Sequence, residues 1–175
     1  MRRVVPGPCP VCNIEIEYLY QTENIPFFSD ILLMTASCEC GYRLVDTVIL
    51  GAGEPVRYTL AVETEEDLDA RVVRSTAGTI EVPELGIKVE PGPVCEAFIS
   101  NVEGVLYRFE SVVDRVLAWA EGEQRDVALA LKAKINDARH LAFPFTVILE
   151  DPDGNSAIIS PNAAQEPLET EREGE

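Results

Sequence analysis

Four of the five cysteines in this sequence fall in two short pairs, Cys9 with Cys12 and Cys38 with Cys40. Paired cysteines of this kind are typical of metal sites in a reducing compartment. Asn13 and Gly41 follow the two pairs, and both residue types tolerate the positive φ that a metal-binding knuckle requires. We therefore predict that the four thiolates bind one zinc ion, with disulfides or free thiols as the alternative.

The predicted zinc site is structural. Four thiolates fill the coordination sphere of zinc and leave no position for a reactive water. Residues 1–50 are too few to bury a substantial core, and modules of this size usually need a metal or crosslink to fold. Strands are expected near residues 14–20, 31–36 and 43–50, which together form a zinc ribbon. The second pair is C-x-C instead of C-x-x-C, so its turn geometry does not follow from the sequence.

The rest of the chain predicts a β domain with an inserted helical hairpin. Short β-branched runs predict strands over residues 56–62, 71–74, 79–82, 87–89, 145–150 and 156–160, with turn residues between them, including residues 65–69. Apolar residues recur at helical spacing between about residues 100 and 142, and Ser100 with Glu103 forms a capping box.

The fold class is therefore mainly β with an inserted α-helical hairpin. A four-cysteine zinc ribbon over residues 1–50 is followed by a β-sandwich or double-stranded β-helix-like domain over residues 51–162, with the helical hairpin at about residues 100–142. Residues 163–175 are acidic and contain almost no large apolar side chain, which predicts a disordered tail.

Charge and composition exclude several functional classes. The net charge is −17, and the first fifty residues hold three arginines against six acidic residues, which disfavours nucleic-acid binding. No apolar run is long enough to cross a membrane. Cys95 is isolated and predicted to be a small buried residue, and His140 is the single histidine. We expect a cytoplasmic protein that is not an enzyme and has no small-molecule substrate.

Several motifs, in this order along the chain, resemble the ZPR-type zinc-finger family. They are CPVC at residues 9–12, IPFF at 25–28, SCECGY at 37–42, VVRS at 72–75, IEVPELG at 80–86, ISNVEG at 99–104 and FTVILEDPDGNS at 145–156. The resemblance implies a single, archaeal-type module, in which a zinc finger precedes a β domain with a helical hairpin. It also implies binding of translation elongation factor one-alpha, as a chaperone or adaptor. A nucleic-acid- or ribosome-associated zinc ribbon is the alternative.

Two groups of residues are candidates for partner binding. The apolar residues near the finger, Ile25, Phe27 and Phe28, either anchor a partner or close the small core of the ribbon. The polar loop residues Glu84, Glu103, Asp151, Asn155 and Ser156 either gather at one end of the β domain as a binding site or form turns and helix caps.

Overall fold

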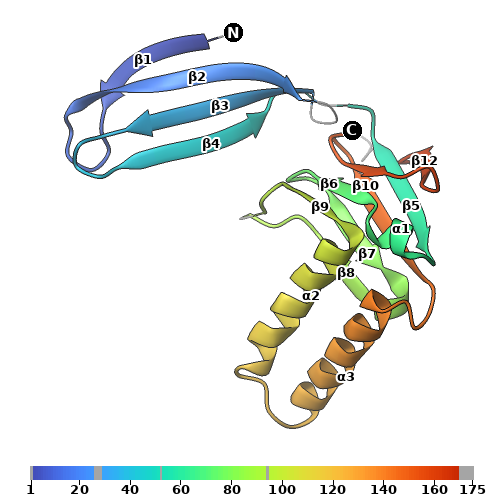
Figure 1. The fold of residues 1–175 in the computed structure, drawn as a ribbon. Coiled ribbons are helices and arrows are strands. Elements are labelled where there is room, and N and C mark those ends of the chain that lie inside the picture. Colours follow the sequence, from blue (N-terminus) through green and yellow to red (C-terminus); the bar gives the residue numbers. More distant parts are fainter. Residues whose placement is uncertain (1, 26–28, 52, 94, 170–175) are drawn as a thin grey trace, which may run out of the picture. The chain divides into compact units, whose positions relative to one another are not determined.

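The computed structural model describes residues 2–25, 29–51, 53–93 and 95–169. The chain divides into two compact units, residues 1–53 and residues 54–175, and each is described by itself. Figure 1 shows the strands of the first unit in blue and cyan, and the strands and helices of the second in green to red.

The first unit is one antiparallel sheet in the order β1-β2-β3-β4. Its strands are β1 (Arg2–Pro8), β2 (Glu15–Ile25), β3 (Ser29–Ser37) and β4 (Arg43–Ile49). Strand β1 was not predicted, because its two prolines argue against a strand; an edge position tolerates them, since one side of β1 needs no partner. Among the residues of this unit whose side chains the structure describes, Cys9, Ile31 and Ala36 alone are buried. The described side chains of this unit therefore form little apolar core, as expected for a metal-dependent module.

The second unit contains two sheets. The larger has the order β12-β5-β10-β7-β8 and the smaller the order β11-β6-β9. Their strands are β5 (Val56–Val62), β6 (Arg71–Arg74), β7 (Thr79–Val82), β8 (Ile87–Val89), β9 (Phe98–Asn101), β10 (Phe145–Asp151), β11 (Ala157–Ile159) and β12 (Ala164–Pro167). The 3-10 helix η1 (Pro83–Leu85) joins β7 to β8. Strand β10 is central, and Phe145, Val147 and Leu149 alternate into the core.

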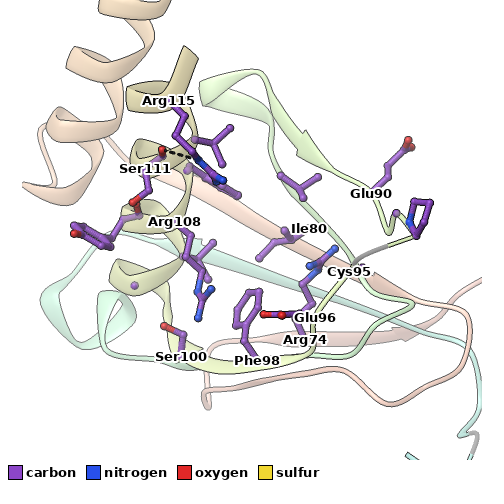
Figure 2. A pocket seen from close by; sticks show the side chains of 18 residues that line it. Arg74, Ile80, Glu90, Cys95, Glu96, Phe98, Ser100, Arg108, Ser111 and Arg115 are labelled. Atoms are coloured by element: carbon purple, nitrogen blue, oxygen red, sulfur yellow. Dashed lines mark hydrogen bonds between the residues drawn. The ribbon is translucent and has the colours of Figure 1, made fainter. Parts of the chain in front are cut away.

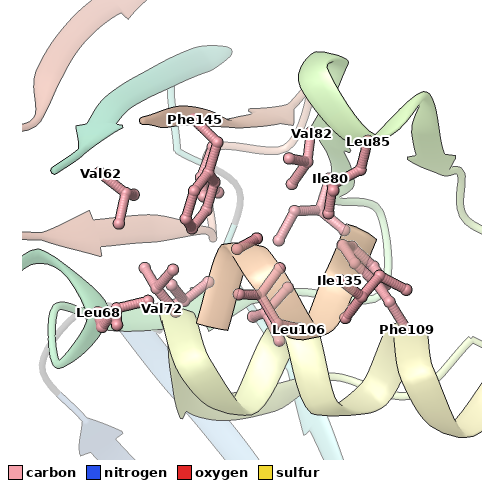
Figure 3. Close-up of a cluster of buried hydrophobic side chains, with 14 of the residues drawn as sticks. Val62, Leu68, Val72, Ile80, Val82, Leu85, Leu106, Phe109, Ile135 and Phe145 are labelled. Carbon is pink, nitrogen blue, oxygen red and sulfur yellow. The ribbon is translucent and has the colours of Figure 1, made fainter. Parts of the chain in front are cut away.

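The predicted helical hairpin lies between β9 and β10. It consists of α2 (Val102–Leu117) and α3 (Gly122–Arg139), which lie side by side in Figure 1. Leu106 and Phe109 of α2 and Ile135 of α3 are buried against Val82 and Phe145 of the larger sheet (Figure 3). The hairpin is thus part of the second unit's core. Among the described helices, none combines the length and apolar character needed to cross a membrane.

The start of α2 differs from the prediction by one residue. Asn101, not Ser100, is the N-cap, and its side-chain oxygen accepts a hydrogen bond from the backbone N–H of Gly104 at 2.8 Å. Ser100 lies in β9, so the predicted capping box with Glu103 does not form. The sequence offers two adjacent N-cap residue types, and because α2 begins at Val102 the residue directly before it, Asn101, takes this position.

The predicted turn at residues 65–69 contains a short helix, α1 (Glu65–Leu68). Thr64 and Asp67 form a capping box around its first turn, in which each side chain satisfies a backbone N–H of the other. Acidic residues favour turns as well as the first turn of a helix, which explains why the sequence pattern read as a turn.

The predicted disordered tail, residues 163–175, contains the strand β12. It pairs with β5, placing Pro167 opposite Val56, and the backbone N–H of Leu168 donates to the carbonyl oxygen of Pro55 at 3.0 Å. Every residue of β12 is exposed. Its pairing rests on backbone hydrogen bonds, which is why the low apolar content gave no strand signal.

Candidate functional site

Each of the two cysteine knuckles is closed by its own backbone hydrogen bond, made to the carbonyl oxygen of the first cysteine of the pair. The residue after the second cysteine of each pair has positive φ, 60° at Asn13 and 94° at Gly41, as the sequence predicted. The N–H of Asn13 donates to the carbonyl oxygen of Cys9 at 2.9 Å, and that of Gly41 to the carbonyl oxygen of Cys38 at 3.0 Å. The C-x-C knuckle is therefore the same turn, shortened by one residue.

The four sulfur atoms lie at the separations that a bound zinc ion requires. The Sγ atoms of Cys9 and Cys40 are 3.7 Å apart, those of Cys12 and Cys38 are 3.5 Å apart, and all four lie within 4.8 Å of one another. Zn–S bonds of about 2.3 Å in a tetrahedron give sulfur–sulfur distances of about 3.8 Å. A disulfide needs about 2.05 Å, so neither pair is a disulfide.

The surroundings of the cluster lower the pKa of the Cys9 thiol and raise the pKa of the other three thiols. Burial opposes ionisation of Cys9, but the backbone N–H groups of Cys12 and Val11 outweigh it and lower its pKa to about 7. At Cys38 the backbone N–H of Cys40 favours the thiolate, yet the Cys40 thiol and burial leave the pKa raised. Four thiolates this close repel one another unless a positive ion neutralises them.

The cysteine cluster therefore holds one structural zinc ion. All four ligands come from the protein, so the bound zinc has no open coordination position for a substrate or water, and its role is to stabilise the fold of this unit. Cys9 is fully buried and Cys40 is exposed, so one side of the cluster faces solvent. The fifth cysteine, Cys95, is half-buried instead of buried as predicted, because it lines an open cavity in the second unit.

Three of the predicted polar residues lie at the turn that follows β10. Asp151 is fully buried, and its carboxylate accepts hydrogen bonds from the hydroxyls of Ser75, at 2.6 Å, and Ser156 and from the backbone N–H of Asp153, at 2.8 Å. Asn155 in the same turn is also buried. This network joins the loop after β6 to the turn between β10 and β11, so it is a structural connection within the second unit.

Glu84 and Glu103 lie elsewhere, so the five residues do not form one cluster. Glu84 accepts hydrogen bonds from the backbone N–H and the hydroxyl of Thr146, at 2.9 and 3.0 Å, near the opposite end of β10 from Asp151. Burial opposes ionisation of Glu84, but the bonds from Thr146 outweigh it and lower its pKa. Glu103, in the first turn of α2, pairs with Arg139 of α3 at 3.3 Å.

The apolar candidates near the finger fall largely outside what the structure describes. Ile25 ends β2, where its backbone pairs with Ser29, while Phe27 and Phe28 lie outside the described residues. Sequence reasoning missed Ser75 and Thr146 as hydrogen-bond partners of the predicted carboxylates. Ser75 lies within the VVRS motif, which was the available signal.

Comparison with known proteins agrees with this architecture. Residues 3–49 match the ZPR1 zinc-finger domain and residues 66–173 match the ZPR1 jelly-roll domain. A ZPR1-like protein of Methanocaldococcus jannaschii is 40% identical over 167 residues, which cover 93% of this chain and 84% of that protein. A ZPR1-like protein of Pyrococcus horikoshii is 42% identical over 160 residues, 87% of this chain and 72% of that protein.

Eukaryotic relatives are longer. The zinc finger chaperone zpr1 of Schizosaccharomyces pombe is 28% identical over 158 residues, which cover 86% of this chain and 34% of that protein. The chain thus matches about a third of that relative's length. With both units matched in order and archaeal relatives covered over most of their length, the chain belongs to the ZPR1 zinc-finger family.

Proposed function

We propose that this protein binds translation elongation factor one-alpha in the cytoplasm and assists its folding, as a zinc-stabilised chaperone and not as an enzyme. The motif resemblance implies this partner, and the Schizosaccharomyces pombe relative carries the name chaperone. A folding assistant needs apolar surface that a client can cover, held on a scaffold that is stable without the client.

The observation that carries the proposal is an apolar patch at the loop end of the helical hairpin. Trp119 is 68% exposed, Val127 64% and Val112 49%. Together with Val116 and Leu131 they line a shallow cavity of about 570 Å³ between α2 and α3. Exposed tryptophan beside aliphatic side chains is the composition expected of the centre of a protein interface.

The charge of the protein suits the proposed partner. The chain carries a net charge of −17, and an elongation factor that handles RNA needs basic surface. Opposite charges steer two proteins together and raise the association rate, while the apolar patch supplies affinity. The same charge disfavours the alternative, a zinc ribbon that binds nucleic acid.

A binding measurement with paired variants tests the proposal. Zinc-loaded protein is titrated with the elongation factor one-alpha of the source organism, using isothermal titration calorimetry. We expect binding that Trp119→Gln or Val127→Gln weakens by about tenfold or more, as for residues at the centre of an interface. Leu129→Gln is the matched control, because Leu129 is exposed on the same helix as Val127 but lies outside the patch.

Folding assistance needs a second readout. Denatured elongation factor is diluted into buffer with the wild-type protein, and the recovered nucleotide-binding activity is measured. We expect a higher yield with wild-type protein and Leu129→Gln than with Trp119→Gln. Absence of binding at micromolar concentrations, or equal effects of the patch and control variants, would refute the proposed role.

A further inference from the structure

An open cavity of about 1000 Å³ in the second unit has an arginine-rich wall. Figure 2 shows Arg74 of β6 and Arg108 and Arg115 of α2 on its lining, with Phe98 of β9 between the first two. Ile80 and Val105 contribute apolar surface. A cavity of this size with a few convergent polar groups on an apolar lining has the dimensions of a small-molecule site.

Arg74 is a buried cation with an unsatisfied donor. It is 6% exposed, and its Nε donates to the carbonyl oxygen of Gly78 at 2.8 Å. Its Nη2 atom is buried and has no hydrogen-bond partner among the described residues. Its guanidinium carbon lies 5.8 Å from the centre of the Phe98 ring. A buried charge without an opposite charge is costly, and an anion beside it removes that cost.

Arg108 approaches the same ring from α2. Its guanidinium carbon lies 4.3 Å from the centre of the Phe98 ring, while the side chain is exposed to the cavity. Arg115 lies about two turns further along the same face of α2. Among the described residues it donates only to the carbonyl oxygen of Ser111, at 3.3 Å. The Phe98 ring thus contacts two guanidinium groups and neutralises neither.

The carboxylates that line the cavity do not neutralise these arginines. Glu90 pairs with Lys88 at 3.3 Å. Glu96 is exposed, and no ion pair joins it to Arg74 or Arg108 within the part of the chain that the structure describes. In a protein with a net charge of −17, this wall is a local concentration of positive charge.

We propose that this cavity binds a small organic ligand through an oxyanion group, a phosphate or a carboxylate, held by Arg108, with the charge of Arg74 beside Phe98 adding to the attraction. Guanidinium groups present paired N–H donors that match the geometry of both oxyanions. The body of the ligand packs against Phe98 and the aliphatic lining. The cavity shares Val112 with the apolar patch around Trp119 but contains neither Trp119 nor Val127. The proposal departs from the sequence-based expectation that the protein has no small-molecule substrate.

Three anions and one neutral molecule test the site on the zinc-loaded full chain. Inorganic phosphate carries the anion alone, phenyl phosphate adds an apolar ring, phenylacetate replaces phosphate by carboxylate, and benzyl alcohol carries the ring without charge. Binding is followed by nuclear magnetic resonance shifts of backbone amides in β9 and α2. We expect phenyl phosphate or phenylacetate to bind more tightly than inorganic phosphate, and benzyl alcohol not to bind at millimolar concentration.

Variants separate a specific site from general charge attraction. Arg108→Gln keeps the helix and the aliphatic stem but removes the charge, and should weaken binding of the tighter aromatic anion by about tenfold. Arg71→Gln changes the net charge equally at an exposed position that does not line the cavity, and should leave binding unchanged.

Three outcomes would overturn the proposal. They are no shifts with any of the three anions, equal loss of binding in both variants, and binding of the neutral alcohol as tightly as the aromatic anions. Because exposed Arg108 contributes little to the core, Arg108→Gln is expected to fold, and its circular dichroism spectrum confirms this before titration. Failure of elongation factor binding would leave these measurements unaffected, so the two proposals are tested separately.

Discussion

The buried carboxylate of Asp151 is the most informative position to perturb, because it was first a candidate for partner binding. Asp151→Asn keeps the size of the side chain and removes its charge. In the structure this carboxylate accepts three hydrogen bonds, two from hydroxyls and one from a backbone N–H. We expect Asp151→Asn to destabilise the second unit.

The magnitude follows from those three bonds. A hydrogen bond to a charged group contributes about 1.5–3 kcal/mol to stability and a neutral one about 0.5–1.5 kcal/mol. Replacing the carboxylate by an amide should therefore reduce the contribution of each hydrogen bond by roughly 1 kcal/mol. The three together lose about 3 kcal/mol. Removing a charge from a fully buried position returns part of its desolvation cost. The net loss in the free energy of unfolding should be about 2 kcal/mol, or a fall in Tm of roughly 5–10 °C.

Urea unfolding followed by far-UV circular dichroism measures this loss, because helices α2 and α3 belong to the second unit. Asp153→Asn is the matched control: it makes the same substitution at an exposed position in the same turn, where the backbone donor to Asp151 is kept. It should change the free energy of unfolding by less than about 0.5 kcal/mol. If Asp151→Asn is as stable as Asp153→Asn but binds the elongation factor poorly, the structural role is wrong and the binding role stands.

Three further predictions follow from the structure. Removing zinc with a chelator should unfold the zinc-ribbon unit, whose amide resonances should lose their dispersion while those of the second unit keep theirs; a ribbon that stays folded without metal would contradict its dependence on zinc. Gly78→Ala would place a Cβ 2.8 Å from the hydroxyl oxygen of Ser156, so it should destabilise by about 1–3 kcal/mol in urea unfolding, whereas Gly92→Ala, with no atom within 4 Å, should be nearly neutral. The side-chain hydrogen bond from Asn162 is the largest influence on the pKa of Asp67 and lowers it below 3.8. The ionised carboxylate therefore stabilises the fold at a pH above its unfolded pKa, and this stabilisation is lost as the pH falls through the lower folded pKa. Asn162→Ala should narrow the difference between the unfolding free energies measured at about pH 6 and pH 2.5, and an unchanged difference would refute this assignment.

The zinc site was predictable because its chemistry is local. The spacing of the cysteines identifies the four ligands. The residue after each knuckle needs positive φ, and Asn13 and Gly41 are residue types that adopt it readily. The turn formed by the C-x-C pair was not predictable, since it depends on whether one hydrogen bond to Cys38 survives the loss of a residue. The helical hairpin was predictable for a similar reason, because its apolar residues recur at helical spacing within one continuous segment of the chain.

What the sequence could not predict depends on strands that meet from distant parts of the chain. Strand β12 is exposed and polar, and it exists only because β5 offers an unpaired edge. Likewise, Ser75 and Asp151 are far apart in sequence, and the adjacent strands and turns bring them together. Arg74 and Arg108 approach one ring from β6 and α2. No local pattern signals such pairings, so the cavity they line escaped the sequence analysis.

The pairing of β12 with β5 has a mechanical consequence. Since Pro167 lies opposite Val56, the first residue of β5 and the last residue of β12 lie at the same end of this strand pair. Tension applied to the start of β5 and the end of β12 would break the hydrogen bonds between the two strands one after another, beginning at this end, and would not load all of them together. Strand β12 should therefore peel away at low force, while the core between the larger sheet and the helices stays intact.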